Sequence, residues 1–151
     1  MSTKPESTFI QNVHGKFVEA PHYEKMHNPY RGGTWDVWYS GLIGDLWIEY
    51  KWLKKYPLRG IVHPDLSPLQ KSWGWARHQE GRNLAVIIGT PAGGILLENP
   101  MHWLNGVHVS VCKEHFTRSK KELACWINEK TGVSGDSSQS SFSCEDRRIV
   151  L

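Results

Sequence analysis

Two short segments of alternating aromatic and β-branched residues constrain the fold of this chain more than any other feature. Residues 34–39 (Thr-Trp-Asp-Val-Trp-Tyr) and 46–52 (Leu-Trp-Ile-Glu-Tyr-Lys-Trp) favour β-strands, and residues 40–45 between them contain two glycines. The pattern predicts a hairpin, and a turn at the midpoint of the connection places Asp36 directly opposite Glu49. Two carboxylates then face each other on one side of a sheet.

Opposed carboxylates repel each other and destabilise a sheet unless a positive charge compensates. A divalent cation does so directly, because two carboxylates suit Mg²⁺, which keeps its remaining waters. Lys51 shares the face of Glu49, where it can neutralise a carboxylate, orient a metal-bound water or contact a phosphate. These groups predict metal-assisted phosphodiester hydrolysis. The alternative is a solvated hairpin face on which Lys51 forms a weak surface ion pair.

Helix signals flank the hairpin on both sides. Residues 5–14 favour a short helix with apolar residues on one face. Ser67-Pro-Leu-Gln70 has the serine, proline and glutamine of a capped helix start, and this helix is expected to reach about His78. Ser119-Lys-Lys-Glu122 is a capping box that opens a helix closed by Gly132.

The remaining segments carry weaker signals. Residues 83–89 favour a buried strand and residues 95–98 a second short one, whereas 20–33 and 53–66 are expected to be irregular. Residues 99–117 are ambiguous, although three valines at alternate positions favour a strand: Val107, Val109 and Val111. The order of elements predicts a single domain of the α/β or α+β class.

Composition excludes several classes of protein. The chain has 151 residues, 39% of them hydrophobic, which suffices for one core without a disulfide framework. No segment is long and apolar enough for a membrane span, and residues 1–6 lack the apolar region of a secretion signal. The three cysteines form no CxxC motif, which predicts reduced thiols and a cytoplasmic location. The net charge of +3 is spread along residues 1–132 and permits an anionic partner without requiring one.

The pattern Gly33-Thr-Trp-Asp36, twelve residues, then Glu49-Tyr-Lys51, followed by the helix that bears Gln70, resembles the PD-(D/E)XK nuclease superfamily. It looks most like the VRR-NUC branch, small nucleases found free-standing in phages. The resemblance covers roughly residues 6–98. It implies a restriction-endonuclease-like α-β-β-β-α-β core with a central mixed sheet flanked by helices. Trp35 departs from the family pattern, which has proline before the aspartate.

The resemblance also implies a domain plan. Residues 1–132 would form one nuclease domain, with its core at about 5–98 and a C-terminal addition, ending in a helix, at 99–132. Residues 133–151 are rich in serine and predict a flexible tail.

The family's functional residues map onto particular positions of this chain. Asp36 and Glu49 look like the metal-binding carboxylates, helped by the backbone carbonyl of Tyr50, and Lys51 looks like the catalytic lysine. Gln70 matches a glutamine of the helix that follows the metal hairpin, and its structural alternative is the capping box alone. The same mapping places Glu6, on the first helix, as an acid near the metal. The alternative interpretation of Glu6 is a favourable charge in the first turn of a helix.

The expected activity is a Mg²⁺- or Mn²⁺-dependent endonuclease that hydrolyses DNA phosphodiester bonds, with branched or junction DNA as the favoured substrate, without a membrane or an organic cofactor. Symmetric cleavage of a junction would need a two-fold homodimer, and a phage enzyme would act in the host cytoplasm. Five basic residues are expected to contact phosphates: Arg31, Lys54, Lys55, Arg59 and Arg77. Two alternatives stay open: a non-catalytic nucleic-acid-binding module, and an inhibitor-type partner-binding protein that uses residues 99–132.

Eight tryptophans are many for a chain of this length. Alternation predicts Trp35 and Trp52 on the buried face of the hairpin. Trp38 and Trp47 are then opposite each other on the face of the carboxylates. There they are either covered by the helix that starts at Ser67 or exposed to stack on unpaired bases.

Overall fold

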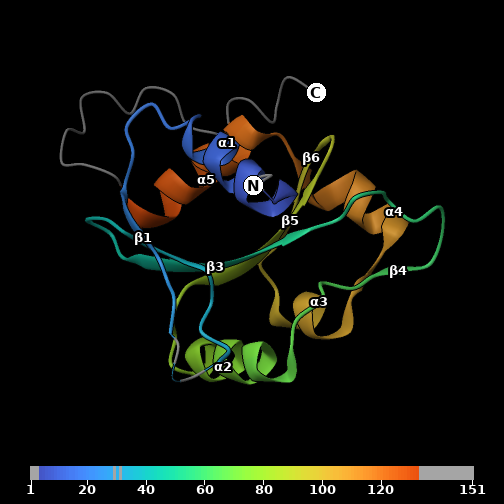
Figure 1. Cartoon of the computed structure of the whole chain (residues 1–151), viewed down its shortest axis with the longest axis horizontal. Helices are drawn as coiled ribbons and strands as arrows, with labels where there is room; N and C mark the ends of the chain where they lie inside the picture. The colour runs from blue at the N-terminus through green and yellow to red at the C-terminus, as the bar shows by residue number, and fades with distance from the viewer. Residues whose placement is uncertain (1–3, 29, 31, 133–151) are drawn as a thin grey trace.

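A six-stranded mixed sheet forms the centre of the molecule, with helices on both of its faces (Figure 1). The computed structural model describes residues 4–28, 30 and 32–132. Its strands lie in the order β1-β2-β3-β5-β6-β8. Their bounds are β1 His22–Lys25, β2 Val37–Ser40, β3 Asp45–Trp52, β5 Leu84–Thr90, β6 Gly93–Leu97 and β8 Thr117–Arg118. The sheet is antiparallel except where β3 pairs with β5.

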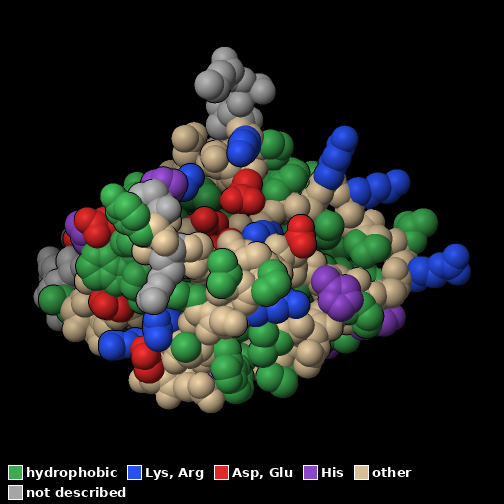
Figure 2. Space-filling model, turned by 60° about the horizontal axis from the view of Figure 1, so that its bottom comes forward, with side chains coloured by type: hydrophobic (Ala, Val, Ile, Leu, Met, Phe, Trp, Pro, Cys, Tyr) green, Lys and Arg blue, Asp and Glu red, His purple; other side chains and the backbone are tan. Residues whose placement is uncertain are grey.

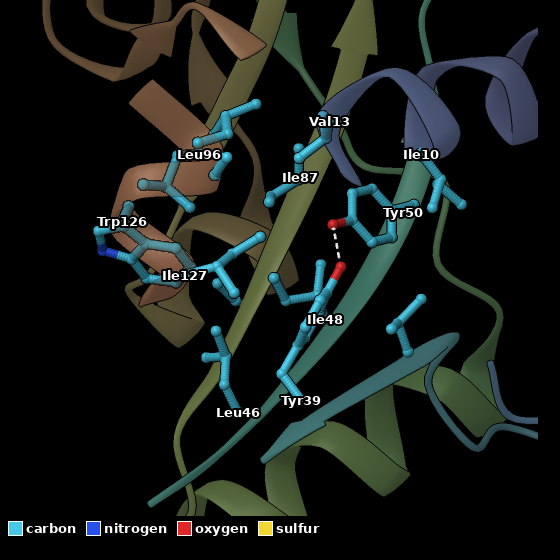
Figure 3. Packing of buried hydrophobic residues seen from close by; sticks show 14 of the residues in the cluster. Ile10, Val13, Tyr39, Leu46, Ile48, Tyr50, Ile87, Leu96, Trp126 and Ile127 are labelled. Carbon is cyan, nitrogen blue, oxygen red and sulfur yellow. Dashed lines mark hydrogen bonds between the residues drawn. The ribbon is translucent and has the colours of Figure 1, made fainter. Parts of the chain in front are cut away.

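Helices α1 (Pro5–His14) and α5 (Lys120–Thr131) cover one face of the sheet, and α2 (Pro68–Gln79) covers the other (Figure 1). The first face buries apolar residues from α1, α5 and the central strands, among which the Tyr39 hydroxyl lies 2.6 Å from that of Tyr50 (Figure 3). The second face buries a separate cluster that includes Trp35, Val86 and Trp103. The sheet thus has a core on each side, and its central strands are apolar on both faces.

The helix signals in the sequence are confirmed. Helix α2 begins after Ser67, whose side chain accepts a hydrogen bond from the Gln70 N–H, and the Gln70 side chain accepts one from the Ser67 N–H in return. Helix α5 has the same capping box at Ser119 and ends at Gly132, which has a φ of +67°. That left-handed conformation favours glycine over residues with a Cβ.

The predicted hairpin register is also confirmed. Strands β2 and β3 pair antiparallel with Trp38 opposite Trp47, and the chain turns between Ser40 and Asp45. Asp36 lies one residue before β2, so the backbone pairing ends beside Glu49. Side chains take over the hydrogen bonds at this point.

The prediction of an irregular segment at 20–33 is wrong at His22–Lys25, which form β1. All four residues are exposed at the edge of the sheet, so the sequence shows no apolar alternation there. With β1, three strands of the central sheet precede α2, and the α-β-β-β-α-β order is thereby confirmed for that sheet. The α/β fold class holds.

The segments around residue 60 and residues 99–116 form an annex beside the sheet. Two two-residue strands, β4 (Ile61–Val62) and β7 (Val107–His108), pair antiparallel, so the prediction of an irregular segment at 53–66 is wrong at β4. The strand predicted from alternating valines is wrong beyond His108, because Val109 and Val111 lie in a helical turn. The helical pieces are α3 (Pro100–Asn105), α4 (Val109–Val111) and the π-helix η1 (Cys112–Phe116).

Trp35 is buried, as predicted, but its predicted face is wrong. Residues 34–36 precede β2, so strand alternation does not apply to them, and Trp35 packs in the core beneath α2. Trp52 packs against the opposite core, as expected. Trp38 and Trp47 are half-buried, and the Trp47 ring lies 5.1 Å from that of Trp73 on α2. Helix α2 therefore covers Trp47.

Two further predictions concern membranes and thiols. Within the described residues, no helix has the length and apolarity needed to cross a membrane. Cys112 is a buried free thiol, in keeping with the prediction of reduced thiols for this residue. The predicted tail at 133–151 lies outside the described residues.

Candidate active site

Asp36 and Glu49 meet where β2 separates from β3. The Asp36 N–H donates to Glu49 Oε1 at 3.1 Å, and the Tyr50 N–H donates to Asp36 Oδ2 at 3.1 Å. Each carboxylate is therefore fixed by the backbone of the opposite chain segment. The predicted opposition of these two acids is a feature of the structure.

Lys51 and Gln70 complete a closed group with Glu49. The Lys51 ammonium lies 3.3 Å from Glu49 Oε2 and donates to Gln70 Oε1 at 3.1 Å. The Gln70 side-chain amide donates to the same Glu49 oxygen at 2.7 Å. Gln70 thus holds the lysine and the carboxylate at once, with Lys51 from β3 and Gln70 from the first turn of α2.

The first turn of α2 is itself held in place. Gln70 Oε1 also accepts from the Ser67 N–H at 2.9 Å, so the capping box and the acidic site share one side chain. The indole of Trp35 donates to the Gln70 carbonyl oxygen at 3.0 Å, which ties the helix to the residue before Asp36. The two interpretations of Gln70 from the sequence, cap and site residue, are compatible in the structure.

Burial and mutual repulsion govern the charges. Glu49 is 1% exposed, and burial, followed by the negative charge of Asp36, raises its pKa to about 8 against the lowering effect of Lys51. Burial also raises the pKa of Asp36, although the hydrogen bond from the Tyr50 N–H and the charge of Lys51 oppose it. The pKa of Glu6, on α1, is raised by burial and then by Asp36. The negative charges of Asp36, Glu49 and Glu6 are therefore not fully compensated by nearby positive charge.

This donor set fits a divalent cation. Asp36 and Glu49 offer hard oxygens, and the Tyr50 carbonyl points to the same side of β3 as the Tyr50 N–H that binds Asp36. Mg²⁺ is commonly held by one or two carboxylates with waters completing its shell. No ready-made group of three or more His, Cys, Asp or Glu ligands occurs in the described part of the chain, so waters would have to fill the remaining positions. Glu6 lies near enough for its charge to raise the pKa of Glu49, and the charge of Asp36 in turn raises the pKa of Glu6.

The predicted phosphate-contacting residues fall into different places. Lys54, Lys55 and Arg59 are exposed on the segment that follows β3. Arg77 lies on α2, where its guanidinium forms an ion pair with Glu80 at 2.8 Å and lies over the Trp73 ring. Arg31 is outside the described residues.

Two residues near the site escaped sequence analysis. Lys25, on β1, lowers the pKa of both Asp36 and Glu6, but it lies in a segment that the sequence pattern assigned to a loop. The sequence predicts Trp35 only as a core residue, and its hydrogen bond to α2 depends on a face that alternation mispredicts. The departure of Trp35 from the family's proline was the one available signal.

By sequence, the chain matches no protein-family model and none of the curated proteins. By structure, it is similar to Hjc, a Holliday junction resolvase from the archaeal hyperthermophile Archaeoglobus fulgidus. The match has a TM-score of 0.51 at 14% identity and covers 83% of this chain and 99% of that one. The fold is restriction-endonuclease-like. In this restriction-endonuclease-like chain, the group formed by Asp36, Glu49, Lys51 and Gln70 lies beside the central sheet.

Proposed function

We propose that this chain is a divalent-metal-dependent endonuclease that hydrolyses DNA phosphodiester bonds. The observation that carries the proposal is the buried group of Asp36, Glu49, Lys51 and Gln70 on a restriction-endonuclease-like fold. Buried carboxylates with raised pKa values need a compensating cation, and Lys51 supplies only one charge against several acids. A metal-ion nuclease accounts for both the shortage and the arrangement.

The protein's own groups would divide the work. Asp36, Glu49 and the Tyr50 carbonyl would hold Mg²⁺ or Mn²⁺, with Glu6 contributing at the edge of the site. The bound cation would polarise the phosphoryl oxygen and lower the pKa of a water molecule. Lys51 would place its ammonium beside the scissile phosphate and stabilise the negative charge that develops there. Gln70 would orient both Lys51 and Glu49 through its two hydrogen bonds.

We propose branched DNA as the preferred substrate, because the structural neighbour is a Holliday junction resolvase and the described charges leave an exposed basic segment directly after β3. Lys54, Lys55 and Arg59 would contact phosphates there. Symmetric cleavage of a junction would require a homodimer. A place in the VRR-NUC branch, a phage origin and a cytoplasmic site of action complete the proposal.

The test is nicking of supercoiled plasmid and of a synthetic four-way junction in Mg²⁺ or Mn²⁺. We expect the unmodified protein to cleave both and EDTA to abolish cleavage. Lys51→Ala should lower the rate about a hundredfold or more, because it removes charge stabilisation at the reacting phosphate. Lys121→Ala is the matched control, since Lys121 is an exposed lysine on α5, and it should cleave as the unmodified protein does.

Two outcomes would contradict the proposal. If Lys51→Ala cleaved DNA at the rate of the unmodified protein, the group around Lys51 would not be the catalytic site. If the unmodified protein bound DNA but cleaved none of these substrates in either metal, the chain would be a non-catalytic nucleic-acid-binding module. Sedimentation of the protein with and without junction DNA tests the dimer, which requires two chains per junction.

A further inference from the structure

The annex beside the sheet ends in a basic tip, in which Lys113 joins three of the predicted phosphate-contacting residues. We define the basic tip as Lys54, Lys55, Leu58, Arg59 and Lys113. Its first four residues follow β3, whereas Lys113 comes from η1, more than fifty residues later. The Lys113 ammonium lies 5.3 Å from the centre of the Tyr56 ring, which brings the two segments together. Charge that is dispersed along the sequence is therefore concentrated in space.

The charge of this region is one-sided. In residues 53–63 and 107–118 the chain carries five Lys or Arg side chains and a single carboxylate, Glu114, whose Oε2 lies 3.7 Å from His115. The net charge of the whole chain is only +3, so the rest of the sequence is close to neutral or acidic. Figure 2 shows long Lys and Arg side chains projecting from the end of the molecule that carries β4 in Figure 1, with hydrophobic and His side chains between them. This end favours a polyanion.

The loop that presents Leu58 is held at three points. The Leu53 N–H donates to the Gly89 carbonyl at 2.8 Å, and the Val109 N–H donates to the Gly60 carbonyl at 2.9 Å. Between them, the Tyr56 hydroxyl lies 2.9 Å from Thr117 Oγ1, and its ring packs against the core beneath α2. The three residues Pro57-Leu58-Arg59 therefore protrude from a fixed base, and proline further restricts the backbone.

Leu58 is 90% exposed at the end of this protrusion. A single exposed leucine is ordinary on a protein surface. Leu58 differs because Lys55 and Arg59 flank it in the sequence, because its loop is anchored, and because Ile61, three residues later, is also about half exposed. An apolar side chain framed by phosphate-binding groups has the character of the wedges that proteins insert between base steps.

We infer that Leu58 is a wedge that enters the branch point of a DNA junction while Lys54, Lys55, Arg59 and Lys113 hold the flanking phosphates. This inference rests on the proposed function and assigns its substrate preference to the tip. An intact duplex hides the apolar faces of its bases, so a leucine gains little there unless base stacking is broken. A branch point already contains unstacked bases and offers that apolar surface without the cost.

The tip is close enough to the acidic site to act with it. Seven residues separate Lys51 from Leu58, and an extended chain of that length spans at most about 25 Å. That distance corresponds to about seven base pairs of duplex. A branch point held at Leu58 would therefore leave a phosphate within about seven base pairs of the junction at the candidate active site.

The experiment measures binding in EDTA, so that no cleavage occurs. Fluorescence anisotropy gives the affinity for a four-way junction and for a linear duplex of the same sequence, and 2-aminopurine beside the branch point reports unstacking. Leu58→Ser is compared with Leu42→Ser, which alters an equally apolar side chain, 73% exposed at the β2–β3 turn. Both positions are exposed, so neither substitution is expected to prevent folding.

We expect Leu58→Ser to weaken junction binding about tenfold, with about a twofold effect or less on the linear duplex, because only the junction buries the side chain. The change in the 2-aminopurine signal that the unmodified protein causes should be lost with Leu58→Ser, and Leu42→Ser should match the unmodified protein. Equal affinities of Leu58→Ser and the unmodified protein for the junction would overturn the inference. So would an equal loss on both DNAs, or an unmodified protein without preference for the junction. Failure of the proposed function is separate, because it appears as absent cleavage in Mg²⁺ while these binding measurements still decide the wedge.

Discussion

Asp36 makes the metal-free protein less stable than it could be. Burial and the negative charge of Asp36 together raise the pKa of Glu49 to about 8. A carboxyl whose pKa is raised on folding binds its proton more tightly in the folded state. The contribution of Glu49 to stability is therefore fully present below its ordinary pKa of 4.5 and is lost as the pH rises through about 8. The site is arranged for a bound cation at the expense of the empty protein.

Asp36→Asn tests this trade-off. The amide keeps an oxygen for the Tyr50 N–H and removes one negative charge, so at pH 8 the Tm of the metal-free variant should rise by about 2–4 °C. Addition of Mg²⁺ should raise the Tm of the unmodified protein but not that of the variant. The variant should also cleave DNA about a hundredfold or more slowly than the unmodified protein. Thermal unfolding with and without Mg²⁺ measures both effects. Asp45→Asn, at an exposed aspartate of β3, is the control, and a lower Tm for Asp36→Asn than for this control would contradict the prediction.

His14 gives a pH dependence of the opposite sign. Burial lowers the pKa of His14 from 6.5 to about 4, and its Nε2 lies 2.7 Å from the Tyr39 hydroxyl. Between about pH 6.5 and pH 4, His14 is therefore protonated in the unfolded chain but neutral in the folded protein. Its contribution to the free energy of unfolding falls as the pH drops through this range. Urea unfolding at pH 7 and pH 5 should show a larger loss for the unmodified protein than for His14→Gln, which cannot titrate. An equal loss in the two proteins would show that His14 is not the group responsible.

Helix α2 is held against the sheet by a close fit of Gly74 to two tryptophans. A Cβ at Gly74 would overlap the Trp35 ring and lie 3.2 Å from Trp103. Alanine favours a helix over glycine by about 1 kcal/mol, but overpacking costs about 1–3 kcal/mol, and neither rigid ring can yield as a flexible side chain would. The clash is expected to dominate.

Gly74→Ala should therefore lower the free energy of unfolding by about 1–2 kcal/mol, measured by urea titration. Because Trp35 also binds the Gln70 carbonyl, the cleavage rate should fall even under conditions where the variant is fully folded. Gly44→Ala is the matched control, since a Cβ there would meet only Asn83 Nδ2, at 3.9 Å. A Gly74→Ala variant as stable as this control would disprove the fit.

The elements with local chemical signals could be predicted from the sequence. The serine caps and the closing glycine defined α2 and α5, and the aromatic alternation gave the β2–β3 register that brings Asp36 to Glu49. Strand β1 could not be found, because an exposed edge strand needs no apolar pattern. Trp35 and Lys113 depend on tertiary contacts, with α2 and with Tyr56, which no local pattern encodes.

The distribution of charge over the surface gives a further prediction. Each phosphate contact by a lysine or arginine releases counterions, so four contacts by the basic tip would give a slope of log K against log salt of about −3.6. Replacing Lys55 and Arg59 together by alanine should make this slope shallower by about 1.8. Affinities measured across a series of NaCl concentrations test this. The double variant of Lys16 and Lys121, lysines exposed elsewhere, should keep the original slope.

Gln70 belongs to two structures at once, the cap of α2 and the acidic site. The coupling between the helix cap and the metal site is reciprocal. If metal binding stabilises the first turn of α2 by a given factor, loosening that turn lowers the metal affinity by the same factor. Amide hydrogen exchange at Ser67, Gln70 and Lys71, whose N–H groups are hydrogen-bonded within the cap, should therefore slow when Mg²⁺ binds, although none of these backbone groups would touch the ion. The helix cap would report the occupancy of the site.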